Sequence, residues 1–184
     1  MTTLRSLVDG FLSYMKDSGI EIYNEFSLQH ELGVFLRTHL PDYQVQFERN
    51  VLHFNNKNTF IKREIDIVVF SPDKTDLKIA IELKFPRNGQ VPEQMFSFVK
   101  DIAFVEELKK AGFKETGLLI FVDSHLFYEG SKNGIYAHFR GHKPITGTIA
   151  KPTGKKDECV GIKGNYRIDW FNLNPEIKYA FVTV

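Results

Sequence analysis

A continuous apolar run at 117–123, GLLIFVD, is the sequence feature that most constrains the fold. It follows a segment with apolar residues at helical spacing, which begins at Pro92 and ends near Ala111, where Gly112 supplies a stop signal. A short apolar run directly after a helix is typical of a parallel strand that is buried on both faces. The chain is therefore predicted to be an α/β protein in which this helix crosses over between two parallel strands.

The residues before this helix predict two further helices and three strands. Apolar residues at helical spacing run from Leu4 to Met15 and end near Gly19. A second helix is expected after Ser27, a plausible N-cap, as far as Pro41. Three segments rich in Val, Ile and Phe follow and are predicted to be strands, at 43–54, 63–70 and 77–85. The expected order of elements is ααβββαβ.

The residues after the apolar run predict a β-rich extension at about 130–184, beyond a core at about 22–123. Three segments of the extension have strand-like composition, at 134–140, 159–173 and 177–184. Seven of the thirteen glycines lie between 130 and 164, so hairpins with mobile loops are expected, particularly at 151–157. Both parts are assigned to one domain, 1–184, because a chain of 184 residues is long enough to bury one core.

Composition and short motifs exclude several classes of protein. Cys159 is the only cysteine, so an internal disulfide and a Cys-rich zinc site are both excluded. Arg5, Asp9 and Lys16 interrupt the N-terminal apolar residues, and no stretch is long enough to span a membrane. A cytoplasmic location is therefore expected. Neither a Gly-x-Gly-x-x-Gly sequence nor a Walker loop occurs, so no nucleotide cofactor is expected.

Charged residues on two neighbouring predicted strands are the candidates for chemistry. Asp66 lies within REIDIVVF (63–70), and a carboxylate in such an apolar strand needs an ion-pair partner, a metal or an open strand end. In KIAIELKF (78–85), Glu82 and Lys84 share one face because side chains alternate along a strand. If the two strands are antiparallel neighbours, Asp66 and Glu82 meet across the ladder within reach of one cation.

A magnesium ion suits this arrangement, since it binds a few carboxylates and keeps its other positions for water and phosphate oxygens. Lys84 lies two residues beyond Glu82 on the same face. It would help to orient or deprotonate an attacking water and would hold the negative charge that develops on a phosphate. The pattern therefore indicates metal-dependent hydrolysis of a phosphate ester.

Asp66, followed sixteen residues later by Glu82-Leu83-Lys84 and preceded by a helix that carries Glu31, resembles the PD-(D/E)xK nuclease superfamily. That superfamily has the restriction-endonuclease-like fold, which is built on an αβββαβ core, so the resemblance covers about 22–123. The chain departs from the family's name at Ile65, which stands where the name has proline.

The resemblance implies a nuclease that uses one or two Mg²⁺ or Mn²⁺ ions to cut phosphodiester bonds. It implies that Glu31, Asp66, Glu82 and the main-chain carbonyl of Leu83 bind the metal. It further implies that Lys84 assists the attacking water. The expected partner is nucleic acid, with DNA favoured, in a restriction, defence or repair setting.

Two residues of the next helix extend the resemblance. Gln94 matches a glutamine that some nuclease branches of the family carry early in the helix after the lysine. Lys100, further along the same helix, is expected near a phosphate. Cutting both strands of a duplex usually requires two sites, which leaves a homodimer open.

Each of these residues also has a purely structural interpretation. Glu82 and Lys84 fit the solvated face of an edge strand, where a lysine discourages edge-to-edge pairing. Asp66 fits an ion pair with Arg63. Glu31 fits an acid placed favourably near a helix N-terminus. Their joint occurrence at fitting positions favours the metal site over these separate explanations.

Other functions are weighed against the nuclease. The fold could serve as a binding module for nucleic acid or protein without catalysis, which the net charge of +1 permits. A glycosidase-like pair of acids is disfavoured because such chemistry has no evident use for Lys84. His138 and His142 lack further zinc ligands, and 123–125 (DSH) is contiguous, unlike a hydrolase triad. The basic run at 140–167 is either a solvated loop or a phosphate contact.

Overall fold

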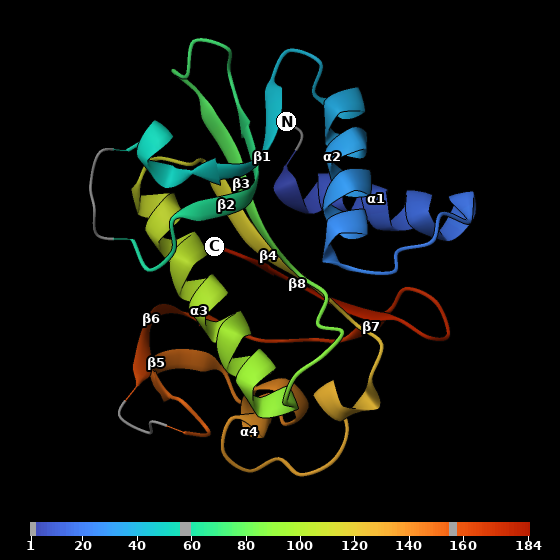
Figure 1. Ribbon diagram of the computed structural model, residues 1–184, viewed down its shortest axis with the longest axis vertical. Helices are drawn as coiled ribbons and strands as arrows, with labels where there is room; N and C mark the ends of the chain where they lie inside the picture. Colours follow the sequence, from blue (N-terminus) through green and yellow to red (C-terminus); the bar gives the residue numbers. More distant parts are fainter. Residues whose placement is uncertain (1–2, 56–59, 155–157) are drawn as a thin grey trace.

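The computed structural model describes residues 3–55, 60–154 and 158–184, and its centre is a mixed sheet of six strands (Figure 1). The strands follow one another in the order β1-β2-β3-β4-β8-β7, and β5 and β6 form a separate two-stranded sheet. None of the helices in these ranges is both long enough and apolar enough to cross a membrane. The elements are α1 (Leu4–Ser18), α2 (Glu25–His39), β1 (Gln44–Asn50), the 3-10 helix η1 (Val51–His53), β2 (Glu64–Phe70), β3 (Leu77–Lys84), α3 (Val91–Lys110), β4 (Glu115–Val122), the 3-10 helix η2 (His125–Phe127), α4 (Tyr136–Arg140), β5 (Ile145–Ala150), β6 (Cys159–Tyr166), β7 (Phe171–Asn172) and β8 (Lys178–Thr183).

Strand β4 is parallel to β3 and is reached through α3, as the apolar run after the helix predicts. All other neighbouring strands in the large sheet are antiparallel. Both faces of β4 are buried: Leu119 and Phe121 belong to the core under α1 and α2, whereas Leu118 and Ile120 belong to the core under α3. The sheet is therefore covered by α1 and α2 on one face and by α3 on the other (Figure 1).

Helix α2 begins earlier than the sequence predicts. Its N-cap is Asn24, whose side chain accepts a hydrogen bond from the Ser27 backbone N–H at 2.8 Å. The Ser27 hydroxyl in turn accepts a hydrogen bond from the Asn24 backbone N–H at 3.1 Å, which completes a capping box. The prediction of Ser27 as the N-cap is wrong, because Asn is an equally good cap one turn earlier. Glu25 therefore lies in the first turn of α2.

The C-terminal elements depart most from expectation. Segment 134–140 is not a strand but ends in α4, in which His138 and Phe139 are buried, together with Ile135 at the N-cap. Strand β5 was not expected, because Gly147, with φ of 67°, interrupts its pattern at a bulge. Segment 159–173 contains both β6 and the short β7, and β8 lies within the predicted 177–184. The expected mobile loop at 151–157 falls partly outside the described residues, which omit 155–157.

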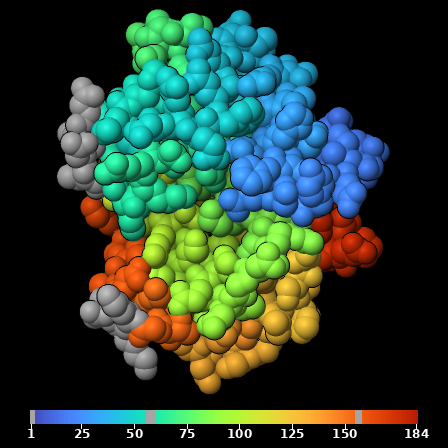
Figure 2. Space-filling view, viewed as in Figure 1, coloured from blue at the N-terminus to red at the C-terminus, as the bar shows by residue number. Residues whose placement is uncertain are grey.

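The β5–β6 hairpin packs on α3, at the opposite end of the molecule from β1 and α2 (Figure 2). Glu106 of α3 is buried and accepts hydrogen bonds from the backbone N–H groups of Lys163 and Gly164, the latter at 2.6 Å. The Tyr166 hydroxyl donates to the same carboxylate at 2.9 Å. One buried acid of α3 thus anchors the hairpin to the main sheet layer.

Candidate functional site

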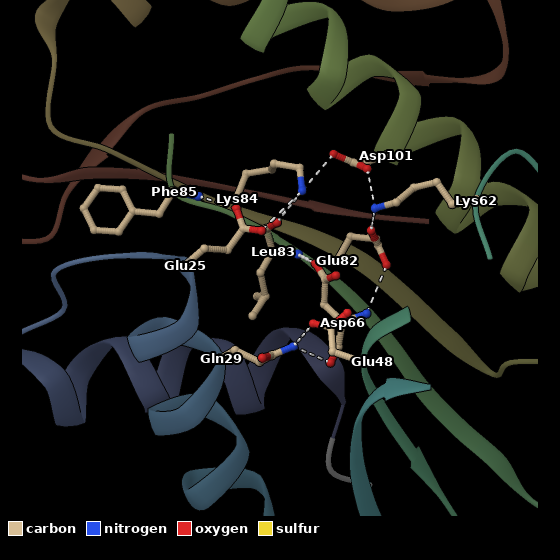
Figure 3. A network of polar contacts seen from close by, with 10 residues as sticks. All are labelled: Glu25, Gln29, Glu48, Lys62, Asp66, Glu82, Leu83, Lys84, Phe85 and Asp101. Atoms are coloured by element: carbon tan, nitrogen blue, oxygen red, sulfur yellow. Dashed lines mark hydrogen bonds and ion pairs between the residues drawn. The ribbon is translucent and has the colours of Figure 1, made fainter. Parts of the chain in front are cut away.

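The candidate site lies where the ladder between β2 and β3 ends. The strands pair as far as Ile67 with Ile81. Beyond that pair, side chains replace backbone partners: the Asp66 carboxylate accepts a hydrogen bond from the Leu83 N–H at 2.6 Å, and Glu82 accepts one from the Asp66 N–H at 3.3 Å. The two predicted carboxylates are therefore brought together at the same end of two antiparallel strands (Figure 3).

Glu82 is the most buried acid of this site, with 0% of its surface exposed. Burial raises its pKa well above the usual range, and the neighbouring Asp66 and Asp101 raise it further. The Lys62 ammonium, which contacts Glu82 directly, works in the opposite direction. Strand β3 lies between β2 and β4, so the interpretation of Glu82 and Lys84 as the face of a solvated edge strand is wrong.

The carboxyl group of Asp66 also has a raised pKa. Burial raises the pKa of its carboxyl group to about 6, although Lys84, Lys62 and the hydrogen bond from Leu83 all favour the charged form. Without further positive charge, Asp66 and Glu82 are thus poorly suited to being ionised at the same time.

Asp101 of α3 joins two lysines from opposite sides of the site. Its side chain is 3% exposed, with Oδ1 at 2.9 Å from Lys62 Nζ and Oδ2 at 3.5 Å from Lys84 Nζ. Oδ2 accepts no hydrogen bond from any described residue, so its contact with Lys84 is only the longer ion pair. Helix α3 therefore contributes a third buried carboxylate that faces the end of β2 and β3 (Figure 3).

Lys84 is held on three sides. Its ammonium donates to the Leu83 carbonyl at 2.9 Å and lies 3.6 Å from Glu25 Oε1. Glu25 also accepts a hydrogen bond from the Phe85 N–H at 3.0 Å, which ties the start of α2 to the end of β3. Burial alone would lower the pKa of Lys84, but Asp101 and Glu25 outweigh it and raise the pKa. The raised pKa favours the ammonium form of Lys84, which suits the stabilisation of negative charge.

Gln29 and Glu48 form the outer wall of the site. The Gln29 amide donates to the Asp66 carbonyl at 2.8 Å and to the Glu48 carboxylate at 2.6 Å. Glu48 has a φ of 48° within β1, a left-handed conformation that is strained for a residue with a side chain. The strained residue is thus linked to the site, because the Glu48 carboxylate and the Asp66 carbonyl accept hydrogen bonds from the same Gln29 amide.

The site as a whole holds more acids than bases. It contains five carboxylates and two ammonium groups, contributed by Glu25, Glu48, Asp66, Glu82, Asp101, Lys62 and Lys84. Three of these carboxylates, Asp66, Glu82 and Asp101, are largely buried, whereas Glu48 is exposed and the Glu25 side chain is 41% exposed. Buried carboxylates in excess of their counter-ions either retain protons or attract further positive charge. A bound cation would offset this excess of negative charge.

The donor set fits a magnesium or manganese ion that is held by few protein atoms. Among the described residues, no three His, Cys, Asp or Glu side chains are placed so that they could hold one metal ion together. Asp66 and Glu82 supply two carboxylates, and the Leu83 carbonyl, which now accepts from Lys84, supplies a third oxygen. Magnesium commonly binds through one or two carboxylates and keeps several waters, so a cage of three acids is not required.

Glu31 is not brought to this cluster. It lies 3.9 Å from His30 and lines a cavity of about 420 Å³ together with Gly10 and Tyr14 of α1. The reason is helical geometry: Glu25 and Gln29 are four residues apart and share the face that meets the site, whereas Glu31 is turned away from that face. The apolar stripe that Glu31 borders faces α1, and Glu25 reaches Lys84 instead.

Gln94 and Lys100 also have contacts outside the cluster. The Gln94 amide donates to the Asn88 carbonyl at 2.9 Å and so braces the loop between β3 and α3. Lys100 lies 2.7 Å from Glu158 and over the ring of Phe96. Neither contact involves Asp66 or Glu82.

Part of the basic run at 140–167 stabilises the fold. Arg140 donates to the Leu126 and Ser131 carbonyls, and Lys151 pairs with Glu93 and Glu158. Lys155 and Lys156 lie outside the described residues.

Five residues of the site were missed by sequence reasoning, namely Glu25, Gln29, Glu48, Lys62 and Asp101. Asp101 did give a signal, because it follows Phe98 by three residues and precedes Val105 by four on the buried side of α3. An acid at such a position needs a partner, which points to a site. Glu25 is marked only as a first-turn acid, and Lys62 lies outside any helix or strand, where spacing carries no information.

Known proteins offer no relative from which a role could be transferred to these residues. No model of a protein family, no curated protein and no solved structure matches the chain. The chemistry of the site therefore follows from its own groups: acids that favour a cation, a carbonyl beside them, and a fixed ammonium that can stabilise negative charge.

Proposed function

We propose that this protein is a divalent-metal-dependent nuclease that hydrolyses phosphodiester bonds, with DNA as the expected substrate in a restriction, defence or repair setting. The observation that carries the proposal is the end of the β2–β3 ladder, where Asp66, Glu82, the Leu83 carbonyl and Lys84 belong to one network. The order αβββαβ from α2 to β4 supports a restriction-endonuclease-like core.

Asp66, Glu82 and the Leu83 carbonyl are the residues that would hold Mg²⁺ or Mn²⁺. When bound, the ion supplies a Lewis acid for the phosphate and favours ionisation of the attacking water. The raised pKa values of Asp66 and Glu82 support this assignment, because a divalent charge would allow both carboxyl groups to ionise.

Lys84 would stabilise the negative charge that develops on the phosphate during attack. Its ammonium is positioned by the Leu83 carbonyl, Glu25 and Asp101. Because these groups fix the ammonium before substrate arrives, little reorganisation is needed in the transition state.

The direct test is to incubate the purified protein with plasmid, single-stranded DNA and RNA, with and without Mn²⁺. We expect metal-dependent cleavage that falls by about 10²-fold or more in Lys84→Ala, since removal of one preorganised charge-stabilising group costs about that much. Asp66→Asn should have a comparable effect. Lys78→Ala is the matched control, because Lys78 lies on the same strand but contacts the ring of Tyr43. Equal cleavage by all variants, with unchanged circular dichroism, would rule out the proposed site.

The alternative is a binding module that uses this fold without catalysis. One observation favours it: Lys62 and Lys84 already pair with Glu82, Asp101 and Glu25, so these lysines neutralise part of the acidic charge without added metal. Calorimetry with Mn²⁺ separates the two proposals. Absence of metal binding, even with nucleic acid present, would favour the module.

A further inference from the structure

Lys62 places its positive charge beside the buried acid Glu82, where a bound metal ion would otherwise lie. It lies just before β2, and its ammonium contacts Glu82 Oε2 and lies 2.9 Å from Asp101 Oδ1. Lys84 differs, because its contacts are with Leu83, Glu25 and Asp101. Of the two amines, Lys62 is therefore the one that directly neutralises a proposed metal ligand.

We propose that Lys62 is a built-in counter-ion that competes with the divalent cation for Glu82 and so sets the metal affinity of the site. The inference rests on the proposed metal site at Asp66 and Glu82. A divalent ion and an ammonium repel each other strongly at contact distance in a partly buried site. The ammonium must therefore leave Glu82 when the ion binds there.

The surroundings of Lys62 allow this movement. Its side chain is 31% exposed, twice the 15% exposure of Lys84, so it can leave Glu82 without unpacking the core. It also lines a hollow of about 300 Å³ together with Arg63, Asn50 and Phe60.

Asp101 provides a second partner for the ammonium once Glu82 is lost. Its side chain is only 3% exposed, and its carboxylate already contacts Lys62 through Oδ1. Lys62 can thus lose its contact with Glu82 while it keeps its contact with Asp101. An exchange of this kind leaves Asp101 neutralised in both states and requires no backbone movement.

A purely structural ion pair makes a different prediction. If Lys62 only stabilised the fold, its removal would lower the melting temperature and leave the metal affinity unchanged or weaker. If Lys62 competes with metal, its removal makes metal binding tighter. Metal affinity in the absence of nucleic acid therefore separates the two roles without any measurement of cleavage.

The experiment is isothermal titration calorimetry with MnCl₂ on wild type, Lys62→Met, Lys62→Arg and Lys132→Met, at constant ionic strength and mildly alkaline pH. Methionine keeps the length of the side chain without the charge. We expect Lys62→Met to bind Mn²⁺ about ten-fold more tightly than wild type, because a like charge at contact distance is removed. Lys62→Arg should remain within about two-fold of wild type because it restores the charge. Lys132 is exposed and lies in the loop before α4, so Lys132→Met controls for net charge.

Affinity in Lys62→Met that equals or falls below that of wild type overturns the inference and leaves the proposed nuclease site standing. Absence of Mn²⁺ binding in every variant overturns the inference, and absence that persists when nucleic acid is added overturns the proposed metal site as well. Should Lys62→Met be unfolded by circular dichroism, Lys62→Gln takes its place with the same expected gain in affinity.

Discussion

Asp66 is a carboxyl group that prefers to keep its proton in the folded protein. Burial raises its pKa to about 6 from the ordinary value of 3.8, and the ammonium groups of Lys84 and Lys62 reverse only part of that shift. Folding therefore opposes the ionisation of a group that is ionised in the unfolded chain at neutral pH. The consequence is measurable as a dependence of stability on pH.

We expect the metal-free protein to lose stability as pH rises from about 4 to about 6, and Asp66→Asn to lose less over the same range. The sign follows from linkage: a carboxyl group with a raised pKa in the folded state binds more protons there, so its contribution is complete below the unfolded pKa and is lost as pH rises through the folded pKa. The variant should gain about 1–3 kcal/mol over wild type across this window. Urea unfolding in EDTA at several pH values measures it, and parallel curves for the two proteins would contradict the assignment.

The sequence predicts that Glu31 of α2 belongs to the site, whereas the structure places Glu25 of the same helix there. Glu25 lies 3.6 Å from Lys84 Nζ, whereas Glu31 lies beside His30. We expect Glu25→Gln to lower the Mn²⁺-dependent cleavage rate by about ten-fold, since small misplacements of catalytic groups have effects of that order. Glu31→Gln should remain within about two-fold of wild type. A larger loss in Glu31→Gln than in Glu25→Gln would reverse this ranking.

Strand periodicity was sufficient to bring Asp66, Glu82 and Lys84 together, because alternation fixes the face of each side chain once two strands are neighbours. It could not place Glu31, since the direction of a helical residue depends on how the whole helix is rotated against the sheet. Lys62 and Asp101 come from a loop and a helix that meet only after packing. Such contacts depend on tertiary structure, and their local trace is limited to the position of Asp101 on the buried side of α3.

Among the elements, α3 connects the candidate site with the C-terminal hairpin. Asp101 faces Lys62 and Lys84, and Glu106, five residues later, accepts hydrogen bonds from β6. Both acids are buried within an otherwise apolar helix surface. The helix is thus the element through which a disturbance of the hairpin would reach the site.

We expect Glu106→Gln to destabilise the protein by about 1–3 kcal/mol, because an amide cannot accept all the hydrogen bonds that the carboxylate accepts and buried donors are left unpaired. Glu129→Gln, at an exposed glutamate, is the control and should change stability by less than about 0.5 kcal/mol. Chemical denaturation gives the free energies of unfolding. Equal stability of both variants would show that the hairpin is not anchored through Glu106.

The elements up to β4 could be predicted from a helical or strand period or, for β4, from a continuous apolar run, whereas those that follow could not. The exception is the strand expected at 43–54, which ends at Asn50 and is followed by the 3-10 helix η1. Segment 134–140 alternates apolar and polar residues, but Ile135 and Phe139 also fit one helical face, and the helix is the conformation found. In β5, Gly147 breaks the alternation at a bulge. Short segments with glycine satisfy more than one pattern, so packing on α3 decides between them.

At the scale of the whole molecule, metal binding should be coupled to stability. A ligand that binds only the folded state stabilises it by about 2.7 kcal/mol at a hundred-fold excess over its dissociation constant. For a chain of this length that corresponds to a rise in melting temperature of about 5–10 °C. We expect such a rise with Mn²⁺ in wild type and none in Asp66→Asn or Glu82→Gln. Differential scanning fluorimetry measures it, and an equal rise in all three would place the ion elsewhere.

Strand β8 lies between β4 and β7, and α1 packs against it: Arg5 donates to the Phe181 carbonyl at 3.2 Å and covers the ring of the same residue. Arg5 thus finds its partner in a residue 176 positions further along the chain. During synthesis on the ribosome, β4 emerges long before β8, the strand that pairs with one of its edges. Until then that edge of β4 has no partner strand, and both faces of β4 are apolar. The free edge of β4 stays unpaired while residues 123–177 are made, so this sheet is completed only as β8 leaves the exit tunnel.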